Sequence, residues 1–434
     1  MTIEIELKFI TTDEAASKLA GKLAEWPHLH VPGEALSNIY FETDSGQLRS
    51  WDMGLRIRGW GDKHEMTLKT AGQTVGGLHQ RPEYNVPLLQ PVLDIQQLPA
   101  EIWPEGVDLD ALQQQLKPLF STHFVREKWV VAWGSSEIEV ALDRGEVTAG
   151  ALSEPINEIE LELKCGQRDD LLAFASELAR MDGLRLGSLS KAARGYALAK
   201  GNPPRAVRPV PVLKLHPKAT VEQGMQSAFL LALEQWQYHE ELWLRGNSSA
   251  FDEIQDALEL LRQAFSLYGT LVPRKASSEL RQRLTQLEAV LAAAEPDASA
   301  VCFSSLWLET QLALTCWIAT MRWRDFIDAK TETRLQGSFK RFSDIMLGRI
   351  AADLKETFAQ VNQPNEYQDK LTRLHRQQLS VCLLAGCYQE SAVSVWLAAW
   401  QQLRQAIVEH NTIWLDGYRR QALKQPAFWK NGSA

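Results

Sequence analysis

The sequence lacks the features of membrane-spanning, secreted and disulfide-rich proteins. No stretch approaches the roughly 18 uncharged apolar residues of a transmembrane helix, so we expect no membrane association. The N-terminus shows no basic segment followed by an apolar run, which argues against a signal peptide. The five cysteines are odd in number and form no Cys-x-x-Cys pair, which argues against a disulfide framework or a zinc knuckle. These absences predict a reduced, cytoplasmic protein.

Charge is unevenly distributed along the chain of 434 residues, which is long enough for about three typical domains. Residues 1–201 contain 20 Lys and Arg against 30 Asp and Glu, whereas residues 202–434 contain 26 against 24. The two parts are therefore chemically different. Because phosphate backbones are bound by basic surfaces, the acidic first part argues against nucleic acid as a partner.

A proline-rich segment separates the two parts. Five of the 18 prolines lie in residues 202–217, and proline fixes φ and donates no backbone hydrogen bond. The segment therefore predicts an extended tether between domains at 1–201 and 218–434. After the tether, long segments with short breaks predict an all-α helical bundle. The expected helices are 221–245, 251–269, 275–295, 303–328, 334–361, 366–388, 390–411 and 412–424.

Apolar and charged residues alternate in the first part with the period of a β-strand. Near the start, the alternation places Glu4, Glu6 and Lys8 on one face and Ile3, Ile5, Leu7 and Phe9 on the other. The same pattern recurs at 56–58, 65–69, 81–85, 126–128, 137–143 and 158–164. Helical segments are expected between these strands at 12–25, 108–120 and 168–181.

The polar faces of these strands carry doublets of like charge two residues apart. Like charges adjacent on one face repel, so the repeated doublets require opposite charges or a ligand to compensate them. If the sheet closes, its polar face becomes a lumen lined by acids and bases. The apolar faces then point outward and need cover from the interspersed helices.

The strand motifs resemble those of the CYTH superfamily, the triphosphate tunnel metalloenzymes. Glu4-Ile5-Glu6-Leu7-Lys8 resembles the ExExK opening, which alone is a weak signal because any amphipathic strand can supply it. The further blocks that resemble family motifs, in chain order, are Tyr40-Phe41-Glu42-Thr43, Gly54-Leu55-Arg56-Ile57-Arg58, Thr67-Leu68-Lys69, Leu142-Asp143-Arg144-Gly145, Glu158-Ile159-Glu160-Leu161-Glu162 and Ser190-Lys191. The ordered set is specific. It implies an α+β N-terminal domain, a closed antiparallel β-barrel or tunnel with flanking helices.

The second part is similar to the CHAD domain, an α-helical domain often fused to CYTH and associated with polyphosphate. CHAD domains usually carry a basic helix resembling HxxRVxxRRLR. The corresponding segment 252–262 keeps mainly Arg262, whereas Leu374-His375-Arg376 fits better. The resemblance implies polyphosphate contact through this domain, and the loss of basic residues weighs against it.

The CYTH–CHAD arrangement resembles bacterial inorganic triphosphatases, which implies metal-dependent hydrolysis of tripolyphosphate to pyrophosphate and phosphate. Binding such a polyanion needs several cations, with Arg favoured for fork-like contacts. The candidates are Lys8, Arg56, Arg58, Lys69, Arg81, Arg126, Lys128 and Lys191. No His or Cys cluster competes for a softer metal, which favours Mg²⁺ or Mn²⁺.

The metal ligands and catalytic residues come from the resemblance. The implied metal ligands are Glu4, Glu6, Asp143, Glu158 and Glu160, with Glu139 and Glu162 as further ligands or supporting groups. The residues expected to be catalytic are Glu4, Glu6, Lys8 and Lys69. The sequence singles out no general base. The scattered histidines, including His79, are expected on the surface or in the core.

Three alternative functions are open. Thiamine triphosphatase and adenylate cyclase belong to the same superfamily, and both need room and contacts for an organic moiety. The sequence shows no obvious feature that supplies these contacts, and only Trp51 and Trp60 near the arginine strand stay open for this role. A non-catalytic polyphosphate-binding scaffold is the third. The complete acidic set argues against the scaffold, because a protein that only binds a polyanion would do so better without these carboxylates.

Overall fold

The structure divides into two compact units. This computed structural model describes residues 2–293, 296–361 and 363–430. The first unit contains the chain through Ala206 together with Val290–Thr320, and the second contains Val207–Ala289 and the chain from Met321 onward. The sequence predicted one helical domain over residues 218–434. In the structure, residues 290–293 and 296–320 pack with the first unit instead, because apolar side chains of the latter range enter its core.

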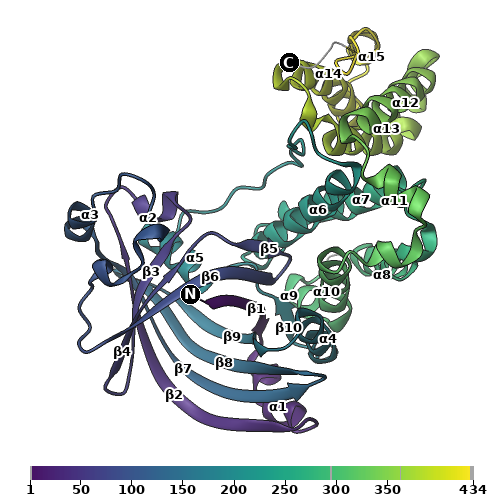
Figure 1. Cartoon of the computed structure of the whole chain (residues 1–434). Helices are drawn as coiled ribbons and strands as arrows, with labels where there is room; N and C mark the ends of the chain where they lie inside the picture. Colours follow the sequence, from purple (N-terminus) through teal and green to yellow (C-terminus); the bar gives the residue numbers. More distant parts are fainter. Residues whose placement is uncertain (1, 294–295, 362, 431–434) are drawn as a thin grey trace. The chain divides into compact units, whose positions relative to one another are not determined.

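Eight antiparallel strands close into a barrel in the first unit. In order around the barrel they are β1 (Thr2–Thr11), β9 (Leu152–Cys165), β8 (Ser136–Ala149), β7 (Lys117–Trp133), β2 (His28–Glu42), β3 (Gly54–Trp60), β4 (Lys63–Lys69) and β6 (Leu78–Leu88). The ring closes because β1 pairs with β6 on one side and with β9 on the other (Figure 1). The expected closed antiparallel barrel is confirmed. Two short strands, β5 (Gln73–Val75) and β10 (Leu184–Leu186), add to β6 and β1.

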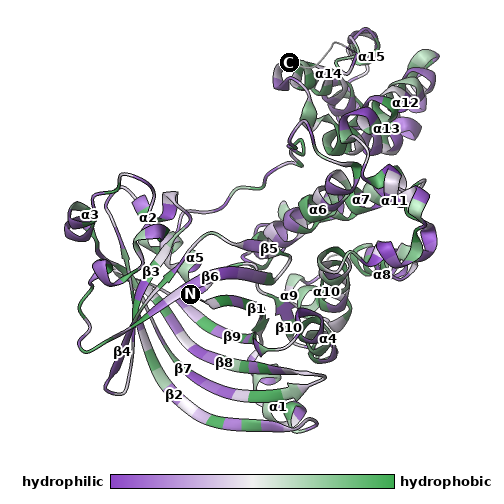
Figure 2. Cartoon of the chain, in the orientation of Figure 1, coloured by the Kyte–Doolittle hydropathy of each residue, from purple (hydrophilic) through white to green (hydrophobic). Residues whose placement is uncertain are grey.

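The alternation of residues along each strand separates a polar lumen from an apolar outer face. On β1, Leu7 and Phe9 are fully buried in the outer core, whereas Glu4, Glu6 and Lys8 line the lumen. Figure 2 shows the resulting bands of hydrophilic and hydrophobic residues along β7, β8 and β9. The period of two in the sequence therefore decides which side chains reach the interior.

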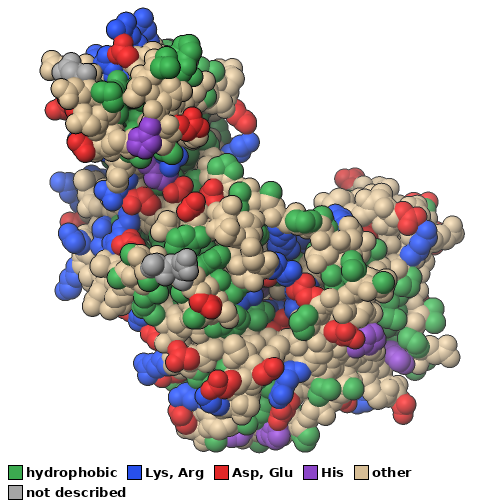
Figure 3. Space-filling view, turned by 180° about the vertical axis from the view of Figure 1, so that it is seen from behind, with side chains coloured by type: hydrophobic (Ala, Val, Ile, Leu, Met, Phe, Trp, Pro, Cys, Tyr) green, Lys and Arg blue, Asp and Glu red, His purple; other side chains and the backbone are tan. Residues whose placement is uncertain are grey.

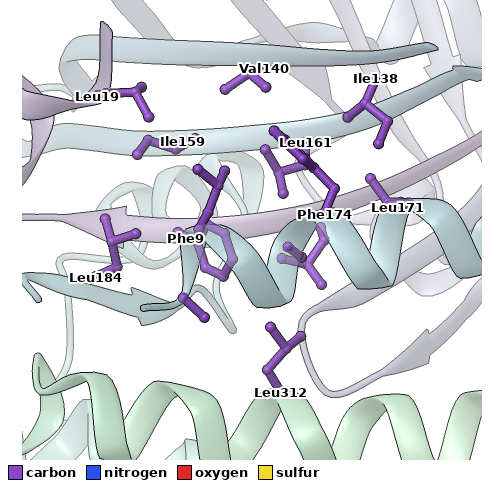
Figure 4. Packing of buried hydrophobic residues seen from close by; sticks show 14 of the residues in the cluster. Phe9, Leu19, Ile138, Val140, Ile159, Leu161, Leu171, Phe174, Leu184 and Leu312 are labelled. Atoms are coloured by element: carbon purple, nitrogen blue, oxygen red, sulfur yellow. The ribbon is translucent and has the colours of Figure 1, made fainter. Parts of the chain in front are cut away.

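Three helices cover one side of the barrel. They are α1 (Asp13–Leu23), α4 (Arg168–Leu178) and α10 (Ser305–Ala319). Leu19 of α1, Phe174 of α4 and Leu312 of α10 belong to one apolar cluster with the outer face of β1, β8 and β9 (Figure 4). This core supplies the cover that the apolar strand faces require.

Two elements beside the barrel differ from expectation. The helix expected at 108–120 is shorter, as α3 (Leu109–Gln115), because the long strand β7 follows at once. Helix α5 (Lys191–Ala199) was not foreseen. It approaches the barrel closely at Gly195, where an added Cβ would lie 2.1 Å from the ring of Phe120.

Part of the proline-rich segment is docked onto the second unit. The Arg208 side chain donates from Nε to Gln235 Oε1 at 2.9 Å, and the Leu213 N–H donates to the Cys382 carbonyl at 2.8 Å. Gly386 permits this approach, since an added Cβ there would lie 1.5 Å from the Leu213 carbonyl oxygen. The segment expected to be a tether is thus held to the helices at these points.

The second unit is an all-α bundle, as expected. Its helices are α6 (Val221–Leu244), α7 (Ala250–Leu267), α8 (Ser278–Leu291), α11 (Ala329–Leu335), α12 (Phe339–Ala359), α13 (Pro364–Leu384), α14 (Glu390–Val408) and α15 (Leu415–Leu423). The end of the helix expected at 275–295 lies outside the described residues. The helix expected at 303–328 ends at Ala319, and Met321 adopts a left-handed φ of 49°. Within the described residues, no helix has both the length and the apolar character needed to cross a bilayer.

Candidate active site

The barrel contains a cavity of about 650 Å³. All eight barrel strands contribute side chains to its wall, and the start of α5 adds more. The wall mixes acidic and basic groups. Because alternate residues of every strand face the lumen of a closed barrel, segments far apart in the sequence converge on this space.

All but two of the expected site residues line this cavity. The residues that do so are Glu4, Glu6, Lys8, Arg56, Arg58, Lys69, Arg81, Arg126, Lys128, Glu160 and Lys191. Asp143 and Glu158 have no exposed surface and lie behind the cavity wall. The expected metal ligands therefore form two groups: Glu4, Glu6 and Glu160 in the cavity wall, and Asp143 and Glu158 buried behind it.

Glu158 is the centre of a buried ionic network. Its Oε1 accepts from Lys8 Nζ at 2.8 Å and from Lys191 Nζ, and its Oε2 accepts from Arg194 Nη2 at 2.6 Å. Three cations thus surround one carboxylate. Burial by itself would raise the pKa of Glu158, but Lys191, Lys8 and Arg194 outweigh burial and lower that pKa to about 2.

Two further carboxylates join the same network. Asp143 accepts from Arg126 Nε at 2.7 Å and pairs with Lys191 at 2.6 Å. Glu160 pairs with Arg126 at 2.5 Å and with Lys8 and Lys191 at 2.9 Å each. Burial opposes ionisation here too, but these cations hold the pKa of Glu160 well below its ordinary range. Each of the three inner carboxylates is thus paired with two or more cations.

The inner carboxylates have the spacing and chemistry of a metal site, but their oxygens already form ion pairs with protein side chains. Oxygen atoms of Asp143, Glu158 and Glu160 lie within 4.8 Å of one another, and an all-carboxylate donor set suits a hard divalent cation. The same oxygens already bind protein cations, namely Lys8, Arg126, Lys191 and Arg194. Of the three, only Glu160 also faces the cavity.

A second acidic group lies in the cavity wall itself. Glu6 on β1 is directly opposite Glu162 on β9, and Glu162 is directly opposite Glu139 on β8. All three line the cavity. Glu162 pairs with Lys164 and Glu139 with Lys128, whereas Glu6 has no ion pair within 4 Å in the described part of the chain. Next to this row, Glu4 pairs with Lys69 at 2.5 Å.

The basic wall contains cations that repel one another. Burial lowers the pKa of Arg58 to about 10, and the neighbouring Arg56 and Arg126 add to this effect. The Arg58 side chain donates from Nε to Asn38 Oδ1 at 2.9 Å. Neither Arg58 nor Arg81 has a carboxylate within 4 Å among the described residues. A bound polyanion would relieve this repulsion.

Two residues near the cavity were not foreseen as site residues. Arg194 lies one helical turn after Lys191 on α5, and both reach Glu158. The Lys-x-x-Arg spacing would have signalled a shared face had the helix been recognised. His79, expected on the surface or in the core, lines the cavity opposite Glu6. Burial is the main cause that lowers the pKa of His79 to about 4, which leaves its imidazole neutral at physiological pH.

Two arginines of the second unit lie in the segments that were compared with the basic CHAD motif, and both are paired with carboxylates. Arg262 donates to both oxygens of Glu288, at 2.9 and 2.8 Å, and Arg376 donates to Glu259 at 2.9 Å. On the face seen in Figure 3, Lys and Arg side chains gather along one edge, and acidic side chains lie beside them. These pairings reduce the positive potential that a polyanion would meet.

Comparison with known proteins assigns a family to each part. The CYTH domain family matches residues 2–196, and the CHAD domain family matches residues 227–421. An inorganic triphosphatase from Haemophilus influenzae is 39% identical over 199 residues, which are 46% of this chain and 55% of that protein. The chain therefore spans about half the length of this curated relative.

Solved structures are also similar to this chain. A putative adenylyl cyclase from Hippeastrum, described as having a dominant triphosphatase activity, is 21% identical, and the match covers 45% of this chain and 95% of that chain with a TM-score of 0.34. The CHAD domain from the plant Ricinus communis is 17% identical, with 51% of this chain and 84% of that chain covered and a TM-score of 0.37. The motifs, the closed barrel and the two family matches agree, and this chain is a CYTH-domain protein that also carries a CHAD domain.

Proposed function

We propose that this protein hydrolyses inorganic triphosphate to pyrophosphate and phosphate in the barrel cavity, with Mg²⁺ or Mn²⁺. The observation that carries the proposal is the division of the cavity wall into a crowded basic region and an acidic row that contains the unpaired Glu6. The basic region can bind a linear polyanion, and the acidic row can bind its divalent counter-ion. The similarity to the inorganic triphosphatase of Haemophilus influenzae supports the same choice.

The phosphate chain would be bound by the cavity-facing cations. Arg58 and Arg81 have no carboxylate partner within 4 Å among the described residues, so their donors are available without breaking an ion pair. Lys69 would leave Glu4 in order to bind phosphate, and Lys8 and Lys191 carry their charge near the inner end. The remaining cations of the proposed phosphate set are Arg56, Arg126 and Lys128.

The divalent cation would be held by carboxylates at the cavity surface. Glu4, Glu6 and Glu160 face the cavity, and Asp143 and Glu158 complete the proposed set from behind it. Glu162 and Glu139, which continue the row beside Glu6, would be further ligands or supporting groups. When bound, Mg²⁺ or Mn²⁺ neutralises charge on the phosphate chain and lowers the pKa of a water molecule. In this role Glu4 would exchange its contact with Lys69 for the cation, which would free Lys69 for phosphate. We therefore assign Glu4, Glu6, Lys8 and Lys69 as the catalytic residues.

Without a bound metal, the deeply buried carboxylates act as counter-ions of the protein cations. Glu158 keeps Lys8 charged: burial alone would lower the pKa of Lys8, but Glu158 and Glu160 outweigh it and raise that pKa above its ordinary value. A charged, fixed ammonium group can bind a phosphate oxygen without rearrangement, which is the basis of electrostatic preorganisation.

The test is phosphate release from tripolyphosphate, ATP and thiamine triphosphate, each with Mg²⁺, Mn²⁺ or a chelator. We expect release from tripolyphosphate only with a divalent cation, and faster than from either organic triphosphate. A higher rate with thiamine triphosphate or ATP would favour the other activities of the superfamily. Equal release in the chelator, or binding of tripolyphosphate with no turnover under any condition, would overturn the proposal. The last result would favour the polyphosphate scaffold.

A further inference from the structure

The barrel unit contains a segment from the far half of the chain. Residues 290–320 lie within the sequence matched by the CHAD family, yet the described residues of this range, 290–293 and 296–320, belong to the barrel unit. The segment contains α9 (Ala298–Cys302) and α10, and we refer to residues 298–319 as the α9–α10 segment. This part of the CHAD match therefore contacts the barrel, and the barrel residues that it contacts lead to the cavity.

Polar contacts fix the α9–α10 segment to the residues just before β10. The Gly183 N–H donates to the Phe303 carbonyl at 2.9 Å, and the Ser305 N–H donates to Asp182 Oδ1 at 3.1 Å. The guanidinium of Arg185, within β10, lies 5.6 Å from the centre of the Phe303 ring. The turn between α9 and α10 is therefore tied to the start of β10 through backbone, carboxylate and aromatic contacts.

Apolar contacts hold the other face of the same strand. Leu308 and Leu312 of α10 are almost fully buried and share one core cluster with Leu184 and Leu186 of β10. Figure 4 shows Leu312 projecting from its helix toward the apolar layer that contains Leu184 and Phe9. β10 thus lies between β1, with which it forms its backbone pairs, and α10.

β10 leads directly to the cavity. The Gly187 N–H donates to the Lys8 carbonyl at 2.9 Å. An added Cβ at Gly187 would lie 2.8 Å from Lys8 Cγ, so this residue touches the stem of the lysine that binds Glu158 and Glu160. The next residues include Ser188, Ser190 and Lys191, all of which line the cavity.

We propose that the α9–α10 segment is a positioning element of the cavity, which clamps β10 against β1 and thereby fixes the stem of Lys8 and the approach to Lys191. β10 is only three residues long, and so short a strand needs buried contacts on its second side to stay in place. The segment touches none of the proposed reacting groups, so it acts through β10. The expected effect on the kinetics of tripolyphosphate hydrolysis rests on the proposed function, whereas the expected effect on the local stability of β10 does not.

The test uses the full-length chain with Leu312→Ala, which removes one apolar contact of α10. We expect amide hydrogen exchange at 184–190 to accelerate by about tenfold or more, because the local opening of β10 becomes easier. With tripolyphosphate, we expect KM to rise by roughly threefold or more and kcat to stay within about twofold, because Lys8 and Lys191 keep their charge in the variant and contact the phosphate chain in the ground state as well as in the transition state. Leu312→Met, which preserves volume, should restore both.

Leu19→Ala is the matched control. Leu19 belongs to the same core cluster and is fully buried, but it lies on α1. We expect it to lower overall stability without selective exchange at 184–190. If Leu312→Ala does not fold, Phe303→Leu removes the ring beside Arg185 and tests the same clamp.

Unchanged exchange at 184–190 in the α10 variants, or equal acceleration by Leu19→Ala, would overturn the inference. If the wild-type chain fails to hydrolyse tripolyphosphate, the proposed function is wrong, but the exchange comparison still decides whether α10 clamps β10. An altered KM without altered exchange would also contradict the clamp, because the effect would then reach the cavity by another route.

Discussion

Glu6 of β1 and Glu162 of β9 lie directly opposite each other in the barrel wall, and both side chains face the cavity. Glu139 continues this row on β8. Like charges placed opposite each other on one face of a sheet are destabilising. Such crowding is common where function needs it, because a ligand compensates the charges only when it is bound. The row of like charges is therefore the feature that favours a ligand-binding cavity over an ordinary solvated polar face.

Glu6→Gln should reverse its effect on stability when ligands are added. In a chelator, the variant should melt at the wild-type temperature or above it, because one repelling charge is removed. With excess Mg²⁺ and tripolyphosphate the wild type should melt higher, since only it gains the full free energy of ligand binding. Hydrolysis should fall by orders of magnitude. Thermal unfolding under both conditions, together with phosphate release, measures this.

Glu137→Gln is the control for that experiment. Glu137 is an exposed carboxylate of the same sheet, on β8, and does not line the cavity. We expect its melting temperature to shift little and equally with and without ligands. A Glu6 variant that behaves like this control, with activity intact, would remove Glu6 from the site.

Glu158→Gln should behave in the opposite way from Glu6→Gln. It removes the negative charge that faces Lys8, Lys191 and Arg194 and replaces one of the two acceptor oxygens by an amide donor, which leaves buried cations uncompensated. Breaking a buried ionic group in this manner costs about 3–5 kcal/mol of unfolding free energy. Denaturant titration in a chelator should show this loss. A stability equal to that of wild type would mean that the buried network is not a structural counter-ion system.

The contribution of Glu158 should also depend on pH. Its pKa in the folded protein is about 2, below the value of about 4.3 of an unperturbed glutamate. A carboxyl with a lowered folded pKa stabilises the fold above its unfolded pKa, and this stabilisation is lost as pH falls toward the folded pKa. The gap in unfolding free energy between wild type and Glu158→Gln should therefore narrow as pH falls from about 5 to about 2. A gap independent of pH would contradict the assigned ionisation.

Arg58→Met should weaken substrate binding without weakening the fold. Arg58 is buried beside other cations, so its removal should leave the unfolding free energy equal or higher when no ligand is present. A charge-assisted hydrogen bond contributes about 1.5–3 kcal/mol, so KM for tripolyphosphate should rise roughly 10- to 100-fold. Steady-state kinetics and denaturant titration test both parts.

Arg144→Met is the matched control for Arg58, because Arg144 is exposed on β8 and does not line the cavity. Its KM should equal that of wild type. If both variants raise KM alike, the effect of Arg58 reflects general charge and not a contact in the cavity.

Glu222→Gln should destabilise the second unit alone. The Glu222 carboxylate accepts from Trp323 Nε1 at 2.9 Å, from Arg324 at 2.9 and 2.7 Å, and from Gln336 at 2.9 Å. Replacing one oxygen by an amide should cost about 1–3 kcal/mol, because it sets donor against donor. Calorimetry should show a lower transition for this unit, with kcat unchanged. The control is the surface ion pair of Glu279 with Arg283, because Glu279→Gln should change the unfolding free energy of this unit little.

Several features of the site could be predicted from local pattern alone. The alternation at Glu4, Glu6 and Lys8 predicted which side chains share a face, and the cavity confirms that they line one space. A strand period of two needs no knowledge of the partner strand. Helix α5, and Arg194 with it, was not predicted, because α5 has only nine residues and the strand period of two carries no information about which residues share a helical face.

The sequence by itself determined the strand faces, the motif order and the change to helices after the proline-rich segment. Only the tertiary structure decided which charges are compensated. Lys8 and Glu158 are 150 residues apart and meet because β1 and β9 are neighbours in the closed barrel. The tertiary structure also decided that α10 packs with the barrel, through Leu312. Charge and hydropathy are properties of each residue, but compensation and burial depend on neighbours that the fold brings together from distant parts of the chain.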